Sequence, residues 1–187
     1  MCIRDRSVAL SCRKNFREAH LSLNGQTDYS YNKEYVAQNE RADYLRYHAL
    51  HASLSTQWSG LSWFQPKLTL AGNLSWKKPD AFSATDNLLK NAYYSLTMDF
   101  YPISKLRLYA DFSQSVFEIA HSHYSVNSFL NAGLRYDFHP RWTVSADLSN
   151  LLNRKDYEVS LYQGANFQYY RVPLRGREFL VSLRFKY

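Results

Sequence analysis

The side chains that could carry out chemistry are present in this chain, but their spacing completes neither a catalytic site nor a metal site. His121 and His123 lie two positions apart, so both would face the same way on a strand. Two ligands are too few for a closed zinc site, which takes four. Asp147, Ser149 and His51 could supply the groups of a hydrolase, but no motif fixes their geometry. We therefore expect no enzymatic activity, no bound metal and no cofactor.

Binding chemistry is concentrated in the segment from residue 153 to residue 176, where aromatic and amide side chains are mixed. Aromatic rings can stack on sugars or planar chelates, and amides can bond to polar groups of such ligands. A loop that packs on its neighbours without a ligand would have a similar composition, so both interpretations stay open. The aromatic residues of the predicted ligand contact are Tyr157, Tyr162, Phe167, Tyr169 and Tyr170.

The elements that must position these residues are β-strands. Apolar and polar residues alternate with period two in eight segments, and no long segment has the period of an amphipathic helix. In residues 106–112, for example, Leu106, Leu108 and Ala110 alternate with Arg107 and Tyr109. The segments run about 9–13 residues, which exceeds the usual length of about 5–6 and suits the 9–11 residues needed to cross a bilayer.

The connections between these segments alternate between short and long. "YPIS" and "HPR" are very short, whereas "DYSYNKEYVAQNERA", "KKPDAFSATDNLLKN" and the segment after residue 152 are long. Outer-membrane barrels have short periplasmic turns and long external loops, whereas the crossings of a soluble sandwich mix lengths at both ends. The sequence therefore predicts an all-β fold, an antiparallel up-and-down transmembrane β-barrel with about eight strands in this chain.

The aromatic residues of the apolar face are sorted to the two ends of the predicted strands, with aliphatic residues between them. Two aromatic girdles around an aliphatic band are typical of a protein embedded in a bilayer. The girdle residues are Trp58, Phe100, Phe138, Trp142 and Tyr187 at the turn end, and Trp76, Tyr94, Phe112 and Phe179 at the other. The opposite face carries charges that we expect to form cross-strand pairs or to guide a substrate: Arg107, Asp111, Arg135, Asp137, Arg184 and Lys186.

Composition agrees with a membrane location that needs no helix. No run of 18 apolar residues occurs and the mean hydropathy is −0.49, which a barrel permits because only one face of each strand is apolar. The formal net charge is +7, and the basic residues are scattered rather than clustered, which disfavours nucleic acid as a partner. We expect outer-membrane lipid and lipopolysaccharide as partners.

The start of the chain is set apart from this pattern. "MCIRDRSVALSCRKNF" is charged and has no apolar stretch of the kind that a signal peptide needs. The two cysteines, Cys2 and Cys12, have no metal spacing. We expect residues 1–12 to be a non-native or disordered leader, and residues 13–187 to be the C-terminal portion of the barrel.

Two stretches near the C-terminus resemble the barrel of TonB-dependent outer-membrane receptors. "WTVSADLSNLLNRKDY" is similar to the penultimate strand of that family, and "GREFLVSLRFKY" to its last strand. The abundance of tyrosine is most similar to receptors of Bacteroidetes-type bacteria. The terminal alternation matches the signal that the barrel-assembly machinery recognises in many outer-membrane proteins, here carried by Phe179, Val181, Leu183, Phe185 and Tyr187.

The resemblance implies a larger protein than this chain. Such receptors have an N-terminal plug, a segment that contacts TonB, and a barrel of 22 strands. We therefore expect a C-terminal fragment of a receptor in the outer membrane, which takes up a siderophore, corrinoid or glycan with energy from TonB. The alternative is a small stand-alone outer-membrane barrel with a structural or adhesive role. A soluble sandwich is the third interpretation.

Overall fold

The computed structural model describes residues 4–38, 41–78, 87–120, 123–163 and 166–187. These residues form eleven β-strands and no helix, and so include no helix long and apolar enough to cross a membrane. The strands are β1 (Arg4–Phe16), β2 (Leu21–Gln38), β3 (Arg41–Trp58), β4 (Phe64–Lys77), β5 (Asn87–Ile103), β6 (Leu106–Ala120), β7 (His123–His139), β8 (Trp142–Ser149), β9 (Asp156–Gln163), β10 (Asn166–Pro173) and β11 (Glu178–Phe185).

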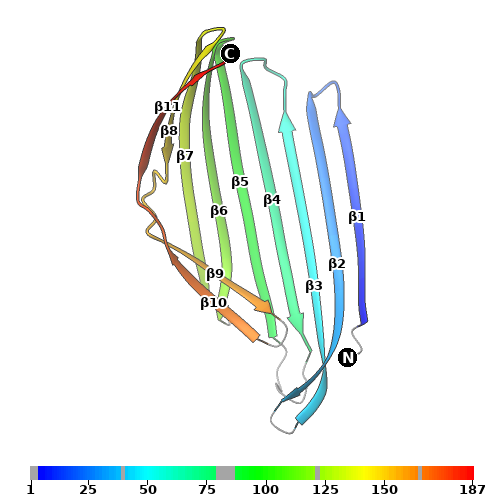
Figure 1. Ribbon diagram of the computed structural model, residues 1–187. Coiled ribbons are helices and arrows are strands. Elements are labelled where there is room, and N and C mark those ends of the chain that lie inside the picture. Colours follow the sequence, from blue (N-terminus) through cyan, green and yellow to red (C-terminus); the bar gives the residue numbers. More distant parts are fainter. Residues whose placement is uncertain (1–3, 39–40, 79–86, 121–122, 164–165) are drawn as a thin grey trace.

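Nine strands form one antiparallel sheet in which chain neighbours are also neighbours in space, in the order β1 to β8 followed by β11 (Figure 1). Strands β9 and β10 pair only with each other. The turns after β5 and β7 lie at the end of the sheet where the chain terminates, because Phe185 of β11 is opposite Trp142 of β8. The predicted all-β, antiparallel, up-and-down arrangement is confirmed.

The register divides the sheet into an apolar and a polar face. On β6 and β7, Leu108 is opposite Leu134 on one face, and Asp111 is opposite Asn131 on the other. Because side chains alternate along a strand, each face continues across all the paired strands. We call these the apolar face and the polar face.

The sheet is a single layer without a hydrophobic core. Among the described residues, only Leu45 and Leu89 are buried hydrophobic side chains. On the apolar face, Leu70, Leu108 and Leu134 remain 42%, 37% and 37% exposed. Folded domains usually bury such a face against a second layer of structure, and the described residues supply none.

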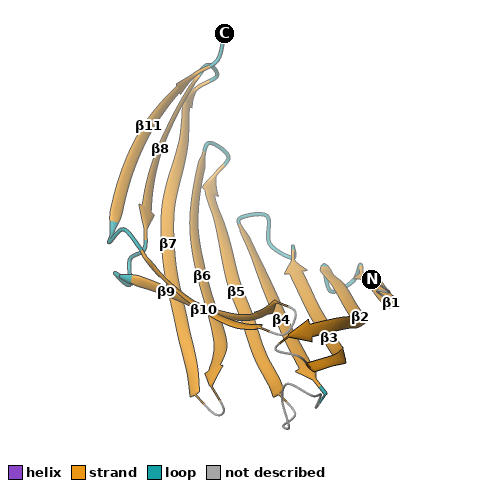
Figure 2. Ribbon diagram, turned by 60° about the horizontal axis from the view of Figure 1, so that its bottom comes forward, coloured by secondary structure: helices purple, strands orange, loops and turns teal. Residues whose placement is uncertain are grey.

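The sheet is curved and open rather than closed (Figure 2). Its two edge strands, β1 and β11, do not pair with each other in the described part of the chain. All eight residues of β11 are exposed. The predicted barrel is therefore not closed by these residues, which form nine strands of an open sheet.

The segment set aside as a leader is part of the sheet from residue 4 onward. Strand β1 pairs with β2 over its whole length, with Val8 opposite Tyr29 and Leu10 opposite Thr27. Its apolar residues therefore continue the apolar face, and the backbone of β2 supplies the hydrogen bonds. Residues 4–12 are thus paired strand in this structure, while the non-native origin of residues 1–12 stays a prediction.

Two further differences concern the segments expected to be loops. Most of "DYSYNKEYVAQNERA" is strand, since β2 and β3 stay paired as far as Gln38 and Arg41. Strand pairing needs only the backbone, so polar side chains do not end it. The segment after β8 is partly strand as well, because it contains β9 and β10. Strand β1, and not β9 or β10, raises the number of strands in the main sheet from about eight to nine.

Candidate functional site

The hairpin formed by β9 and β10 lies across the polar face, where it crosses β6 and β7 (Figures 1 and 2). The expected external loop is thus folded against the sheet at this point. Beyond its own pairing, the hairpin contacts β6 and β7 through β9. The candidate site is the region where this hairpin meets the polar face.

Asn150 holds both ends of the segment that carries the hairpin. Its backbone is in the left-handed region, with a φ of 53°, and the residue is only 8% exposed. The side-chain amide donates to the carbonyls of Arg154 (2.7 Å) and Arg175 (2.9 Å), and its oxygen accepts from the N–H of Arg154 (2.8 Å). The first asparagine of "NLLN" therefore has a structural role, because it ties residue 154 to residue 175.

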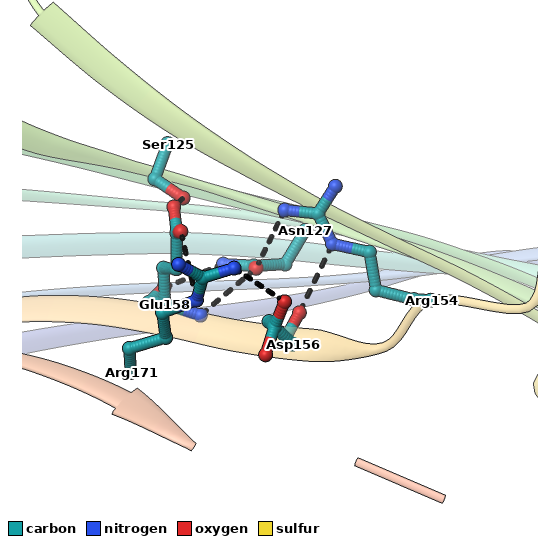
Figure 3. A network of polar contacts seen from close by, with 6 residues as sticks. All are labelled: Ser125, Asn127, Arg154, Asp156, Glu158 and Arg171. Atoms are coloured by element: carbon teal, nitrogen blue, oxygen red, sulfur yellow. Dashed lines mark hydrogen bonds and ion pairs between the residues drawn. The ribbon is translucent and has the colours of Figure 1, made fainter. Parts of the chain in front are cut away.

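Asn127 of β7 attaches the free edge of β9 to the sheet (Figure 3). Its side chain accepts a hydrogen bond from the N–H of Glu158 (3.1 Å) and donates one to the carbonyl of Glu158 (2.6 Å). One carboxamide thus satisfies two backbone groups that would otherwise lack strand partners. Asn127 is 0% exposed, so these bonds lie away from water.

Two serines complete the attachment. The hydroxyl of Ser125 donates to the Glu158 carboxylate at 2.6 Å, and the hydroxyl of Ser160 donates to the carbonyl of Glu118 at 2.5 Å. Ser125 and Ser160 are 4% and 1% exposed. The contact between hairpin and sheet is therefore made of small buried polar groups, each with a partner.

Charged residues of the hairpin form a second set of contacts (Figure 3). Arg171 of β10 forms an ion pair with Asp156 at 2.7 Å and lies 3.8 Å from the carboxylate of Glu158. The hydrogen bond from Arg171 holds the pKa of Asp156 below its usual value. The hydrogen bond from Ser125, with smaller contributions from Tyr169 and Arg171, lowers the pKa of Glu158. Both carboxylates are thus kept in their charged forms.

A pocket of about 310 Å³ lies beside the attached edge of β9. Tyr157 closes one side of it, and its ring meets those of Phe117 (6.1 Å between centroids) and Phe129 (6.2 Å). Asn73, Asn91, Tyr93, Ser113 and Ser115 contribute to the remaining lining. Aromatic rings beside amides and hydroxyls can bind a polar ligand by stacking and hydrogen bonds. A larger hollow of about 500 Å³, near the turn between β1 and β2, lies on the edge of the sheet.

The structure separates the aromatic residues predicted to contact a ligand. Tyr157 lines the pocket, whereas Tyr169 and Tyr170 are 42% and 46% exposed. Tyr162 and Phe167 are opposite each other in the pairing of β9 and β10, and their side chains lie outside the described part of the structure. The pocket instead contains Phe117 and Phe129, which period-two alternation alone does not distinguish from other aromatic strand residues.

Asp147 and His51, which were considered as groups of a hydrolase, are each hydrogen-bonded to a different side chain. Asp147 accepts a hydrogen bond from the Tyr109 hydroxyl (2.6 Å), while His51 is bonded to the side chain of Asn73 (2.6 Å). His121 lies outside the described residues. Within the described ranges, no group of three His, Cys, Asp or Glu residues could hold a metal ion.

Charges on the polar face form contacts between neighbouring strands, in part as predicted. Arg107 of β6 forms an ion pair with Asp99 of β5 at 2.7 Å, and the Thr97 hydroxyl donates to Asp111 at 2.9 Å. Arg135 instead lies 3.5 Å from Asp137 on its own strand. These contacts hold the polar face together and leave the substrate-guiding alternative as a prediction.

Most of the predicted girdle residues at the turn end contact other aromatic rings. Phe100 stacks on Phe64 with 4.7 Å between centroids, and Trp58 meets the same ring at 6.4 Å. Trp142 lies 4.7 Å from Phe185, which in turn contacts Tyr187. At the other end, Trp76 stacks on His48, and Tyr94 meets Phe112. Phe138 is 46% and Phe179 65% exposed. Their role at a membrane boundary stays a prediction.

Comparisons with family models, with curated proteins and with solved structures gave no significant match to this chain.

Proposed function

We propose that this chain forms part of the wall of an outer-membrane β-barrel of the TonB-dependent receptor type. The whole receptor would take up a scarce nutrient such as a siderophore, a corrinoid or a glycan, with energy delivered by TonB. The missing hydrophobic core is the observation that carries the membrane part of this proposal. Burying one large aliphatic side chain is worth about 1.5–3 kcal/mol, and a leucine-rich face left in water would lose that contribution at every position.

The height of the apolar face supports the same proposal. Ten residues separate Trp58 at the turn end of β3 from His48, which stacks on Trp76 at the other end. At about 3.4 Å per residue this span is about 34 Å long, and a strand tilt of about 40° reduces it to a height of about 26 Å. The apolar band of outer-membrane barrels is about 25 Å tall.

The open sheet favours a part of a large barrel over a small complete one. In lipid every backbone N–H and C=O needs a partner, so an unpaired edge strand is not tolerated there. The edges of β1 and β11 do not meet in the described structure. A polar face that carries a folded hairpin and a pocket also suits a wide lumen better than an interior filled by side chains.

The nutrient-binding part of the proposal rests on the pocket beside β9 and on the resemblance of β8 and β11 to the last two strands of TonB-dependent receptors. Tyr157 and the amides of Asn73 and Asn91 offer stacking and hydrogen bonding on the lumen side of the wall. The stand-alone barrel with a structural or adhesive role is the second candidate. It would share the apolar face, but it would have to close β1 on β11.

Quenching of a fluorescent label tests the membrane orientation. In the complete protein, with Cys2 and Cys12 replaced by serine, Leu96→Cys and Ser95→Cys each place one label on β5. The Leu96 position belongs to the apolar face and should be quenched by nitroxide-bearing lipid, whereas the Ser95 position should respond to aqueous iodide. Equal quenching at the two positions by either agent would contradict a lipid-facing apolar surface.

A further inference from the structure

Three basic residues of β2, β3 and the segment after β4 stand in one row on the apolar face, at the end away from the turns, and the register places Arg4 of β1 opposite Lys33 in the same row. Lys33 of β2 is directly opposite Arg46 of β3. Lys78 follows β4 and donates its N–H to the carbonyl of Arg46 at 3.2 Å. We call this set the basic row. Neighbouring strands lie about 4.8 Å apart, so three positive charges come within about 10 Å although 45 residues separate them in the chain.

In the described parts of β2 and β3, the basic row has no acidic neighbours on its own face. Strands β2 and β3 contain three carboxylates in their described parts, Asp28, Glu34 and Asp43. Their partners in the register are His51, Leu45 and Val36, which places all three on the polar face. None of the described residues forms an ion pair with Lys33, Arg46 or Lys78. Lys33 lies over the ring of Tyr44 at 4.0 Å, and Arg46 and Lys78 are exposed.

An aromatic row lies directly next to the basic row. Tyr31, His48 and Trp76 are opposite one another on β2, β3 and β4. The rings of Tyr31 and His48 are 4.9 Å apart, and those of His48 and Trp76 stack at 5.1 Å with 1° between their planes. The Tyr29 hydroxyl also bonds to His48 at 2.8 Å. Among the described residues at this end of the apolar face, the shortest distance between ring centroids is that of Tyr31 and His48.

The spacing between the two rows matches the boundary of a bilayer. Lys33 and Arg46 lie two residues beyond Tyr31 and His48, a distance of about 7 Å along the strand. Amphipathic rings favour the border between acyl chains and head groups. The head-group layer adds about 5–7 Å on each side of the hydrocarbon, so the basic row falls at the level of lipid phosphates.

We propose that Lys33, Arg46 and Lys78 form a binding site for phosphate-bearing anionic lipid on the outer surface of the barrel wall, above the Tyr31–His48–Trp76 row. This inference rests on the membrane orientation proposed above. The three cations neutralise the phosphates, and the aromatic row packs against the upper part of the acyl chains. The site therefore holds one class of lipid at a fixed place on the wall.

The test measures lipid affinity of the complete protein in neutral detergent, with fluorescent phosphatidylglycerol as the anionic probe and phosphatidylcholine as the zwitterionic one. Each basic residue near an anionic surface contributes about 1 kcal/mol, so the triple variant K33Q/R46Q/K78Q should bind phosphatidylglycerol roughly 100-fold more weakly. Binding of phosphatidylcholine should not change. The charge-conserving variant K33R/R46K/K78R should keep the affinity, and it shows whether a loss comes from charge or from misfolding.

Lys67→Gln is the matched control, because Lys67 lies on β4 but belongs to the polar face near the turns. It should leave phosphatidylglycerol binding unchanged. Wild-type affinity in K33Q/R46Q/K78Q, or an equal loss in Lys67→Gln, would overturn the site. Displacement of the lipid by inorganic phosphate at constant ionic strength would overturn it too, because the ligand would then be the free anion. Failure of the membrane orientation itself would instead appear as equal quenching at residues 95 and 96.

Discussion

At the residue scale, Gly133 leaves the space that the ring of Tyr109 occupies. A Cβ at this position would lie 2.5 Å from the ring, whereas a Cβ at Gly72 would meet its nearest neighbour at 3.9 Å. Gly133→Ala should therefore displace Tyr109 and break its 2.6 Å bond to Asp147. We expect a loss of about 1–3 kcal/mol in the free energy of unfolding, measured by denaturant titration of the complete protein in detergent.

Gly72→Ala is the control for this substitution and should cost much less. In a Tyr109→Ala background the ring is gone, so Gly133→Ala should then be nearly neutral. Additive losses in the double variant would show that the contact between Gly133 and Tyr109 is not the cause.

Asn127 permits a second prediction at the residue scale. Asn127→Ala removes the partner of both the N–H and the carbonyl of Glu158, and each buried group left without a partner costs about 1–3 kcal/mol. Amide hydrogen exchange at Glu158 should become at least tenfold faster, while exchange in β8 stays the same. Val126→Ala alters the neighbouring residue, which is 41% exposed, and should leave exchange in β9 unchanged. Unaltered protection of Glu158 in Asn127→Ala would refute this role.

At the scale of the element, alternation along β8 predicts that a charged substitution has a high cost at one position and a low cost at the next. Val144 belongs to the apolar face and is opposite Leu183, whereas Ser145 belongs to the polar face, where its hydroxyl meets that of Ser182 at 2.7 Å. Val144→Arg should cost about 2–4 kcal/mol in a bilayer, and Ser145→Arg much less. Unfolding in lipid vesicles measures both. Similar costs at the two positions would contradict the assignment of faces.

The β9–β10 hairpin should loosen in acid. The pKa values of Asp156 and Glu158 are held below their ordinary values of 3.8 and 4.5. Folding therefore favours the charged forms, so their contribution is complete above about pH 5 and is lost as the pH falls through the lowered pKa values. Protection factors of hairpin amides, followed from pH 7 to pH 3, should decline only in the acid part of this range.

Arg171→Gln tests the cause of this acid response. It removes the partner that lowers the pKa of Asp156, so the protection should be weaker at pH 7 and should fall less between pH 7 and pH 3. Arg175→Gln removes an exposed ion pair with Glu178 outside the hairpin and should leave the size of this fall unchanged. An identical fall in all three proteins would exclude the ion pair of Arg171 as a source of the pH dependence.

At the scale of the whole molecule, the open sheet predicts that this chain cannot assemble alone. Both edges present unpaired backbone groups, which lipid does not tolerate and which promote aggregation in water. The isolated chain should aggregate and should show no difference in gel mobility between heated and unheated samples in detergent. A compact, heat-modifiable monomer with a melting transition would instead support the stand-alone barrel, because it would require β1 to close on β11.

The sequence by itself determined the local features of this protein. Period-two alternation predicted strands and their two faces, because the direction of a side chain depends only on its position along the strand. The short turns after β5 and β7 were also predicted, because short connections join antiparallel neighbours. The first of them lies at Ser104 and Lys105, since β5 extends to Ile103. The pattern was less informative at residues 4–12, 29–38 and 41–43, where strands with many polar side chains are held by backbone pairing.

Only the tertiary structure decided which distant residues meet. The attachment of Glu158 to Asn127 depends on how a hairpin folds back over a sheet, and no local pattern distinguishes Asn127 from the other asparagines. The basic row depends on the register of three strands, because a shift of one residue would move Lys33 to the other face. The open edges of β1 and β11 likewise depend on curvature summed over nine strands, which the alternation within any single strand cannot specify.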